Sequence, residues 1–198
     1  MSHRPRHPWL YTRLALLLCV QFAVIYGGTN WLTSLRGDVH RVYFDWELGI
    51  PLVPAMAWIY GSIVILMLLP AFRLDSAGLR GLAKQISVAM LIAGCVFLVY
   101  PGRIAYEAVA DLPPAIRAIR TVDLPYNVIP SLHVALSALV MLFLYPTYRL
   151  PGRLFLAAWM LAMIASVLLT HQHHVADVVA AGLLVWTCRR LMPQAISS

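Results

Sequence analysis

Three histidines and one aspartate stand together in the stretch THQHHVADVVAAG, residues 170–182, of an otherwise strongly apolar chain. His173 and Asp177 are four residues apart, so on a helix they share one face and the carboxylate can accept a hydrogen bond from one ring nitrogen. That contact leaves the other ring nitrogen basic and outward, which is how a histidine nucleophile is oriented. His174, three residues from Asp177, competes for the same oxygen. Spacing alone does not choose between the two histidines.

A second polar group opens the stretch NVIPSLHVALSALV, residues 127–140. Ser131 follows Pro130 and is a residue type that caps a helix start, where the next backbone amides have no partner within the helix. Such a start concentrates free N–H groups and partial positive charge, and it suits a phosphate. His133, in the first turn, can add a proton donor. Taken alone, the pattern is more typical of a capped helix with a structural histidine.

These residues admit three other interpretations. A metal site would use His171, His173, His174 and Asp177, but ligands one or two positions apart on a helix diverge, and the sequence has no second cluster to complete the shell. A proton pathway would need ionisable groups along a span, whereas these stand at the ends of spans. A serine protease would need a glycine-rich elbow around Ser131, which is missing. We therefore expect no metal and no cofactor.

The elements that carry these residues are predicted to be membrane helices. Of the 198 residues, 61% are hydrophobic and 12% are charged, which is typical of a membrane protein. We predict a single domain over residues 1–198 with an all-α fold, a bundle of six transmembrane spans. The fourth and sixth spans are short, so we expect them inside the bundle with polar ends facing a water-filled site. The predicted spans are 14–32, 51–72, 85–100, 131–145, 154–170 and 174–188.

The basic residues predict the orientation of the bundle. Segments on one side, the two termini included, carry ten basic residues against one acid, and segments on the other side carry five against seven. The positive-inside rule then places both termini in the cytoplasm and the starts of spans four and six on the outer side. This placement indicates membrane lipids rather than nucleic acid as partners. Compact loops favour the inner membrane of a bacterium, and the oligomeric state is not predicted.

The loop from Gly102 to Ile129 on the outer side contains two stretches, GRIAYEAV and PPAIRAIR, with apolar residues three to four apart. This spacing predicts a helical segment lying in the membrane interface between spans three and four.

The two motifs together resemble the type 2 phosphatidic acid phosphatase superfamily. Pro130-Ser131-Leu132-His133 and, about 40 residues later, His173-x-x-x-Asp177 are similar to that family's second and third motifs, and the P-S-L-H form resembles a branch that includes inositol phosphorylceramide and sphingomyelin synthases. The resemblance implies a metal-independent enzyme that acts on a lipid phosphate. His173 would attack phosphorus to give a phosphohistidine, Asp177 would orient it, and His133 would protonate the leaving oxygen. Ser131 and the amides that follow it, starting at Leu132, would hold the phosphoryl oxygens.

The chain departs from the family's motifs in its cations. Val167 stands where the third motif has arginine, and His171 stands where the synthase branch often has lysine. We therefore expect Arg103 to supply the charge a phosphoryl group needs, with Arg117 or Arg120 as weaker candidates, and His171 and Asn127 to contact the substrate. Three functions stay open: hydrolysis of a lipid phosphate or diphosphate, headgroup transfer through the same histidine, and a non-catalytic membrane protein that retains the fold.

Overall fold

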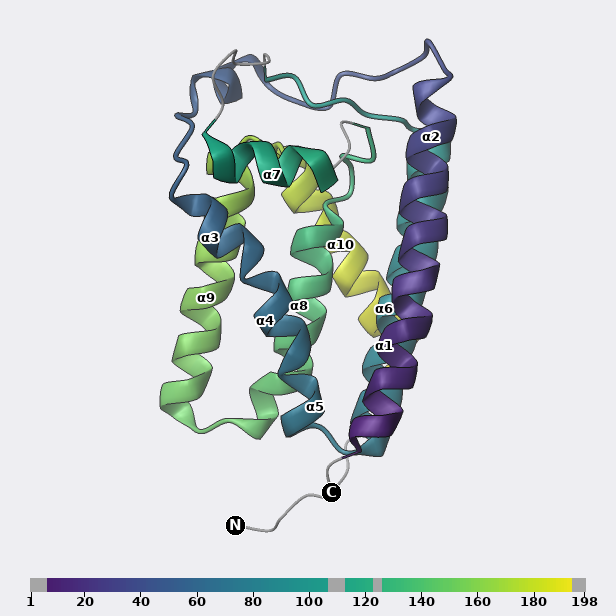
Figure 1. The fold of residues 1–198 in the computed structure, drawn as a ribbon, viewed down its shortest axis with the longest axis vertical. Coiled ribbons are helices and arrows are strands. Elements are labelled where there is room, and N and C mark those ends of the chain that lie inside the picture. Colours follow the sequence, from purple (N-terminus) through teal and green to yellow (C-terminus); the bar gives the residue numbers. More distant parts are fainter. Residues whose placement is uncertain (1–6, 107–112, 123–125, 194–198) are drawn as a thin grey trace.

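The computed structural model describes residues 7–106, 113–122 and 126–193. Within these ranges every regular element is helical, and extended backbone pairs only at an isolated bridge between His40 and Gly102. The predicted all-α class is therefore confirmed. Figure 1 shows helices that run roughly along the long axis of a bundle, with one short helix, α7, lying across one end.

The helices follow one another with short connections. A π-helical turn, Ala23–Gly27, joins the first two helices into one continuous rod, and 3-10 turns cover Asp45–Gly49 and Tyr145–Thr147. The α-helices are α1 (Pro8–Phe22), α2 (Gly28–Ser34), α3 (Met56–Gly61), α4 (Ile63–Leu68), α5 (Pro70–Arg73), α6 (Ser76–Val99), α7 (Pro114–Val122), α8 (Leu132–Leu144), α9 (Leu150–Leu169) and α10 (Val175–Leu191).

Local chemistry explains where the principal helices begin. Pro8 is the first residue of α1, where a missing N–H costs nothing because that position has no intrahelical acceptor. Asp75 precedes α6 and its carboxylate accepts a hydrogen bond from the Gly78 amide at 2.8 Å. Ser131 does the same for α8, because its hydroxyl accepts from the Val134 amide at 3.3 Å. The predicted cap at Ser131 is thus confirmed.

Four helical segments of the described chain are long and apolar enough to cross a membrane: Pro8–Ser34, Met56–Arg73, Ser76–Val99 and Leu150–Leu169. They correspond to predicted spans one, two, three and five. The helices of predicted spans four and six, α8 and α10, have 13 and 17 residues. A 13-residue helix rises only about 20 Å, against a hydrocarbon core of about 30 Å. The structure therefore supports four spans, and the other two crossings of the predicted six stay a prediction.

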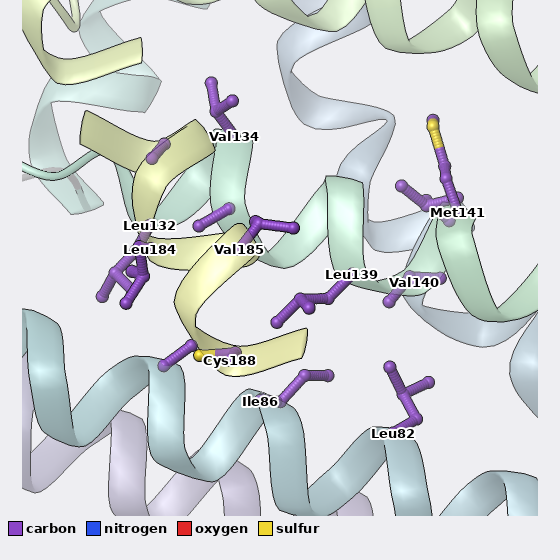
Figure 2. Close-up of a cluster of buried hydrophobic side chains, with 14 of the residues drawn as sticks. Leu82, Ile86, Leu132, Val134, Leu139, Val140, Met141, Leu184, Val185 and Cys188 are labelled. Carbon is purple, nitrogen blue, oxygen red and sulfur yellow. The ribbon is translucent and has the colours of Figure 1, made fainter. Parts of the chain in front are cut away.

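The hydrophobic core lies around α8. Nine of its 13 residues are buried, whereas α1 buries none and exposes Leu16 and Leu17 to the surroundings of the bundle. Figure 2 shows side chains from three helices meeting here, among them Ile86 of α6, Leu139 of α8 and Cys188 of α10. The short helix α8 is thus enclosed by longer ones, as predicted from its length.

The predicted helical segment between spans three and four is present only in part. Its second stretch forms α7, and Ile116 anchors that helix because it is fully buried. Gly102–Tyr106, the start of the first stretch, has no helical backbone, and residues 107–112 lie outside the described residues. The wrong expectation for 102–106 has a physical reason: the Pro101 carbonyl accepts from the His40 amide at 2.7 Å, which holds this backbone extended. The position of α7 in a membrane interface stays a prediction.

The two ends of the bundle carry different segments. The first residue of α1, the junction of α5 and α6 and the turn between α8 and α9 lie at one end in Figure 1, while α7 and the starts of α8 and α10 lie at the other. The motif helices therefore begin at the same end, and the basic turns that follow α5 and α8 lie at the opposite end.

Candidate active site

A backbone hydrogen bond joins the starts of α8 and α10. The Ser131 amide donates to the carbonyl oxygen of Asp177 at 3.1 Å, although the two residues are far apart in the sequence. Both residues are fully buried. The predicted convergence of the two motifs is therefore observed, and the first turn of α10 lies directly beside the cap of α8.

His173 contacts Asp177 through its ring. Its Nδ1 lies 3.3 Å from Asp177 Oδ2, the same oxygen that accepts the His174 backbone amide at 2.7 Å. The His173 ring therefore donates from Nδ1 and leaves Nε2 with its lone pair, because a neutral imidazole carries one proton. Asp177 Oδ1 is buried and has no hydrogen-bond partner among the described residues. This geometry settles the competition that spacing left open: His173, and not His174, has its ring on the carboxylate.

His174 turns to a different carboxyl group. Its Nδ1 lies 3.2 Å from Glu47 Oε2, and its Nε2 accepts the backbone amide of Ala105 at 3.2 Å. Glu47 is fully buried and also accepts the amides of Val175, at 2.8 Å, and Phe44, at 3.1 Å. Burial lowers the pKa of the His174 ring, against the opposing effect of the Asp177 and Glu47 charges. Glu47 thus holds both the first amide of α10 and its preceding histidine.

Sequence reasoning missed Glu47 as a member of this cluster. It lies 127 residues before His174, in the stretch FDWELGIP, and nothing in its spacing relates it to either motif. One signal was present: an acid between aromatic and apolar neighbours is costly to bury without partners. Its carboxyl oxygens accept from the Phe44 and Val175 amides and contact the His174 ring, so the partners that it needs come from its own turn or from residues distant in the sequence.

The turn between α9 and α10 directs the three histidines to different partners. The His171 amide donates to the Leu168 carbonyl at 3.1 Å and the Gln172 amide to the Val167 carbonyl at 3.1 Å, which is the Schellman pattern of a helix end. His171 takes the left-handed position of this motif, with a φ of 58° that usually favours glycine. The strain is offset by contacts of its ring, because Nε2 lies 2.9 Å from the Ile50 carbonyl oxygen.

Tyr106 packs against two histidines of the same turn. Its ring stacks on that of His171, with centroids 3.8 Å apart, and on that of His174, at 4.8 Å. Burial raises the pKa of the Tyr106 phenol to about 12, so the hydroxyl stays protonated and donates to the Glu47 carbonyl oxygen at 3.2 Å. Burial likewise lowers the pKa of His171. His171 is therefore a structural part of the turn, and the structure does not bring it to the cavity described next.

His133 and His173 line one small cavity of about 90 Å³. His133 Nε2 lies 3.0 Å from the Tyr60 carbonyl oxygen and 3.2 Å from Met163 Sδ, and its ring stacks on that of Tyr60 with centroids 3.9 Å apart. Donation from Nε2 to the carbonyl leaves Nδ1 as the nitrogen that can exchange a proton. The remaining lining residues are Phe22, Tyr26, Ile63, Asn127, Leu132 and Leu136.

The predicted phosphate contacts are brought to the cavity only in part. Leu132 lines it, so a helix start does face the two histidines. The Ser131 amide is already bonded to Asp177, which leaves the amides of Leu132 and His133 as those without an acceptor in the helix. Asn127 also lines the cavity, but its Nδ2 donates to the Tyr26 carbonyl at 2.7 Å and to Thr29 Oγ1 at 2.9 Å. Asn127 therefore ties the motif loop to the rod of α1 and α2.

The predicted cation, Arg103, lies elsewhere. It is exposed and lines an outer pocket of about 640 Å³, together with Arg36 and Arg41. The described residues that line the cavity of His133 and His173 include neither lysine nor arginine. The reason is the bridge between Gly102 and His40, which places Arg103 beside residues 36–43 rather than at the cavity. Among the described residues, no group of three or more histidine, cysteine or acidic side chains is placed to hold a metal ion.

Comparison with known proteins gives a family. The model of the PAP2 superfamily matches residues 34–189, which include both motifs, the Glu47 cluster and every helix from α3 to α9. No curated protein and no solved structure matches the chain significantly. Because the matched residues make up well over half of the 198, the chain belongs to the PAP2 superfamily.

Proposed function

We propose that this protein is an integral membrane phosphatase that hydrolyses a lipid phosphate or diphosphate through a phosphohistidine on His173. Members of the superfamily are phosphoester hydrolases, which sets the class of reaction. The observation that carries the proposal is the placement of His133 and His173 on one cavity, with Asp177 on the far nitrogen of the His173 ring. A nucleophile oriented by a carboxylate and facing a second proton-transfer group is the arrangement that nucleophilic catalysis requires.

In the first step, the lone pair of His173 Nε2 attacks phosphorus and the bond from phosphorus to the lipid oxygen breaks. The His133 ring, charged once the anionic phosphate lies beside it, gives its Nδ1 proton to that oxygen, so the lipid leaves as an alcohol, or as a monophosphate when the substrate is a diphosphate. Water then attacks phosphorus while His133 takes one of its protons, the bond from phosphorus to His173 Nε2 breaks with its electron pair returning to that nitrogen, and inorganic phosphate leaves. Asp177 stabilises the positive charge on His173 while the new bond forms.

The phosphoryl oxygens need compensating charge in this cavity. The free amides at the start of α8, those of Leu132 and His133, carry the partial positive charge of the helix end. An anionic phosphate also favours the charged form of the His133 ring beside it. Together these groups take the place of the arginine that the chain lacks at Val167. Because they carry less charge than a guanidinium group, we expect slow turnover.

We further infer a topology of six crossings, in which α8 and α10 are the two short ones. Both helices begin at the end of the bundle where the site lies, and the basic loops lie at the other end. With the positive-inside rule, this arrangement supports cytoplasmic termini and a site at the outer face of a bacterial inner membrane. The phosphate headgroup of a lipid in the outer leaflet would then lie at the same depth as the starts of α8 and α10.

Phosphate release from purified protein tests the proposal. With a chelator present, the wild type is expected to release inorganic phosphate from at least one of phosphatidic acid, phosphatidylglycerol phosphate and a polyprenyl diphosphate. His173→Ala should abolish release, and His7→Ala, at the opposite end of the bundle, should leave it unchanged. Labelled substrate quenched in alkali should leave label on the wild type and none on His173→Ala. Release that survives His173→Ala at the wild-type rate refutes the mechanism.

A second function, transfer of the phosphoryl or headgroup moiety to an alcohol, is favoured by two observations. The P-S-L-H form resembles the synthase branch, and the aromatic walls of the cavity, Phe22, Tyr26 and Tyr60, restrict water. The two functions differ in the fate of the label. With candidate acceptor alcohols present, label that appears only as inorganic phosphate excludes transfer, and label in a new lipid product excludes simple hydrolysis.

A further inference from the structure

An apolar groove lies between α1, α4, α5, α6 and α8. Its volume is about 310 Å³, within the range of small-molecule sites, and none of its lining residues is charged. Leu18 and Cys19 of α1 form one wall, and Ile86 and Met90 of α6 form the wall opposite. The helices α1 and α6 contact each other, and the lining residues run from Tyr11 to Phe22 on α1 and from Leu79 to Met90 on α6, so the groove follows the two helices, which run along the bundle in Figure 1.

The groove is adjacent to the cavity of His133 and His173. Phe22 and Leu136 line both spaces, one from α1 and the other from α8. Phe22 also stacks on Tyr26, with ring centroids 4.9 Å apart and the planes within 9°, and Tyr26 lines the cavity. An apolar space thus lies next to the cavity, with the side chains of Phe22 and Leu136 between the two.

The wall formed by α1 lies outside the part of the chain that matches the family. The family match begins at residue 34, and α1 with Phe22 and Tyr26 lies entirely before it. The rod formed by α1 and α2 is fixed to the site, because Asn127, just before the Pro130–His133 motif, donates to the Tyr26 carbonyl and to Thr29 Oγ1. Tyr11 secures its other end by donating to the Met67 carbonyl at 3.0 Å. Because α1 is held at both ends beside the cavity, its side chains can determine the shape of the groove and so which molecules fit in it.

We propose that this groove holds the hydrocarbon chain of the phosphorylated lipid whose phosphate lies at His173, and that α1 selects the substrate by its chain. The inference rests on the proposed function and adds the site for the apolar part of the substrate. A phosphate at the outer end and a chain along α1 is also the direction that a lipid takes in a bilayer. The bilayer is as apolar as the groove, so moving the hydrocarbon tail from one to the other contributes little binding free energy. The effect of the groove is to hold the tail in one place and so to orient the phosphate.

Alkylation of Cys19 tests occupancy without relying on turnover. Cys19 lines the groove and is exposed, Cys95 on α6 is exposed but lies outside the groove, and Cys188 is buried. A long-chain alkyl phosphonate, which has no ester to hydrolyse, is expected to slow maleimide labelling of Cys19 on the order of tenfold while labelling of Cys95 stays unchanged. A butyl phosphonate should protect neither. Equal protection of both cysteines, or of neither, overturns the proposal.

Kinetics of two matched variants separate this inference from the proposed function. Leu18→Trp fills the groove, whereas Leu17→Trp places the same ring on the exposed face of the same helix. For Leu18→Trp we expect kcat/KM to fall on the order of tenfold for a long-chain lipid phosphate and to hold for its short-chain analogue, with Leu17→Trp like the wild type for both. If Leu18→Trp changes both substrates equally or neither, the groove is not the chain site and the phosphatase stands. If the wild type releases phosphate from no lipid, the proposed function fails and this inference fails with it.

Discussion

The buried carboxyl group of Glu47 gives the most direct test of how the site is held. Its Oε2 accepts the Val175 amide and the His174 ring, and its Oε1 accepts the Phe44 amide. Glu47→Gln keeps the shape but replaces one oxygen with an NH₂ group, which donates where an acceptor is needed. The best orientation keeps the oxygen toward α10 and leaves the Phe44 amide facing another donor.

The size of the effect follows from these contacts. A hydrogen bond to a charged group contributes about 1.5–3 kcal/mol, and a buried donor left without a partner costs about 1–3 kcal/mol. Removal of a buried charge offsets part of that loss. We expect Glu47→Gln to lower the free energy of unfolding by about 2–3 kcal/mol, which corresponds to a fall in Tm of about 5–10 °C for a chain of this size.

Thermal unfolding of the purified protein in detergent measures this shift. Asp45→Asn is the matched control, because Asp45 is an exposed acid two residues earlier whose ion pair with Arg41 is open to solvent, and such pairs contribute little. Its Tm should stay at the wild-type value. A Tm for Glu47→Gln within about 1 °C of that of Asp45→Asn would show that the carboxylate does not hold the start of α10, and the reasoning would be refuted.

Three further predictions concern the motifs and their turn. Ser131→Ala removes the cap of α8 and should lower the free energy of unfolding by about 1 kcal/mol, seen as a shift of a few degrees in Tm; Ser131→Asn, which can cap, should restore it. Asp177→Asn should lower kcat on the order of 10²–10⁴-fold while KM changes little, because His173 loses the carboxylate that fixes its tautomer; a kcat within about threefold of wild type contradicts that role. Burial lowers the pKa of both His171 and His174 below the value of about 6.5 expected in the unfolded chain, so the unfolded state binds protons first as the pH falls. Their contribution to stability is therefore complete above about pH 6.5 and is lost as the pH falls below it; a Tm that is unchanged or higher at about pH 5.5 than at about pH 7.5 contradicts this sign.

Much of the fold and part of the site follow from local sequence patterns. The cap at Ser131 and the face shared by His173 and Asp177 depend on neighbours within four residues, and the structure has both. Successive spans cross in opposite directions, so spans four and six run the same way and the two motifs are predicted to begin at the same end. The hydrogen bond from the Ser131 amide to the Asp177 carbonyl confirms this placement. The span count itself was less secure, since α8 is apolar but too short to cross by length alone.

The missed and misplaced residues depend on contacts between distant segments. Glu47 reaches His174 across 127 residues, and no periodicity records such a contact. Arg103 was assigned to the phosphate by its charge, but the path of the extended loop carries it to the outer pocket. His171 was assigned to the substrate by its alignment with a lysine, whereas its backbone lies in the left-handed region at the end of α9 and its ring is held by Ile50 and Tyr106.

Asp177 works through two chemically separate parts. Its main-chain oxygen binds the amide of Ser131, and its carboxylate binds His173 and the amide of His174. Replacement of the side chain leaves the main-chain bond intact, so the docking of one helix on the other survives an alteration of the acid. The contact between the two helix starts and the partner of the His173 ring thus depend on different atoms of one residue.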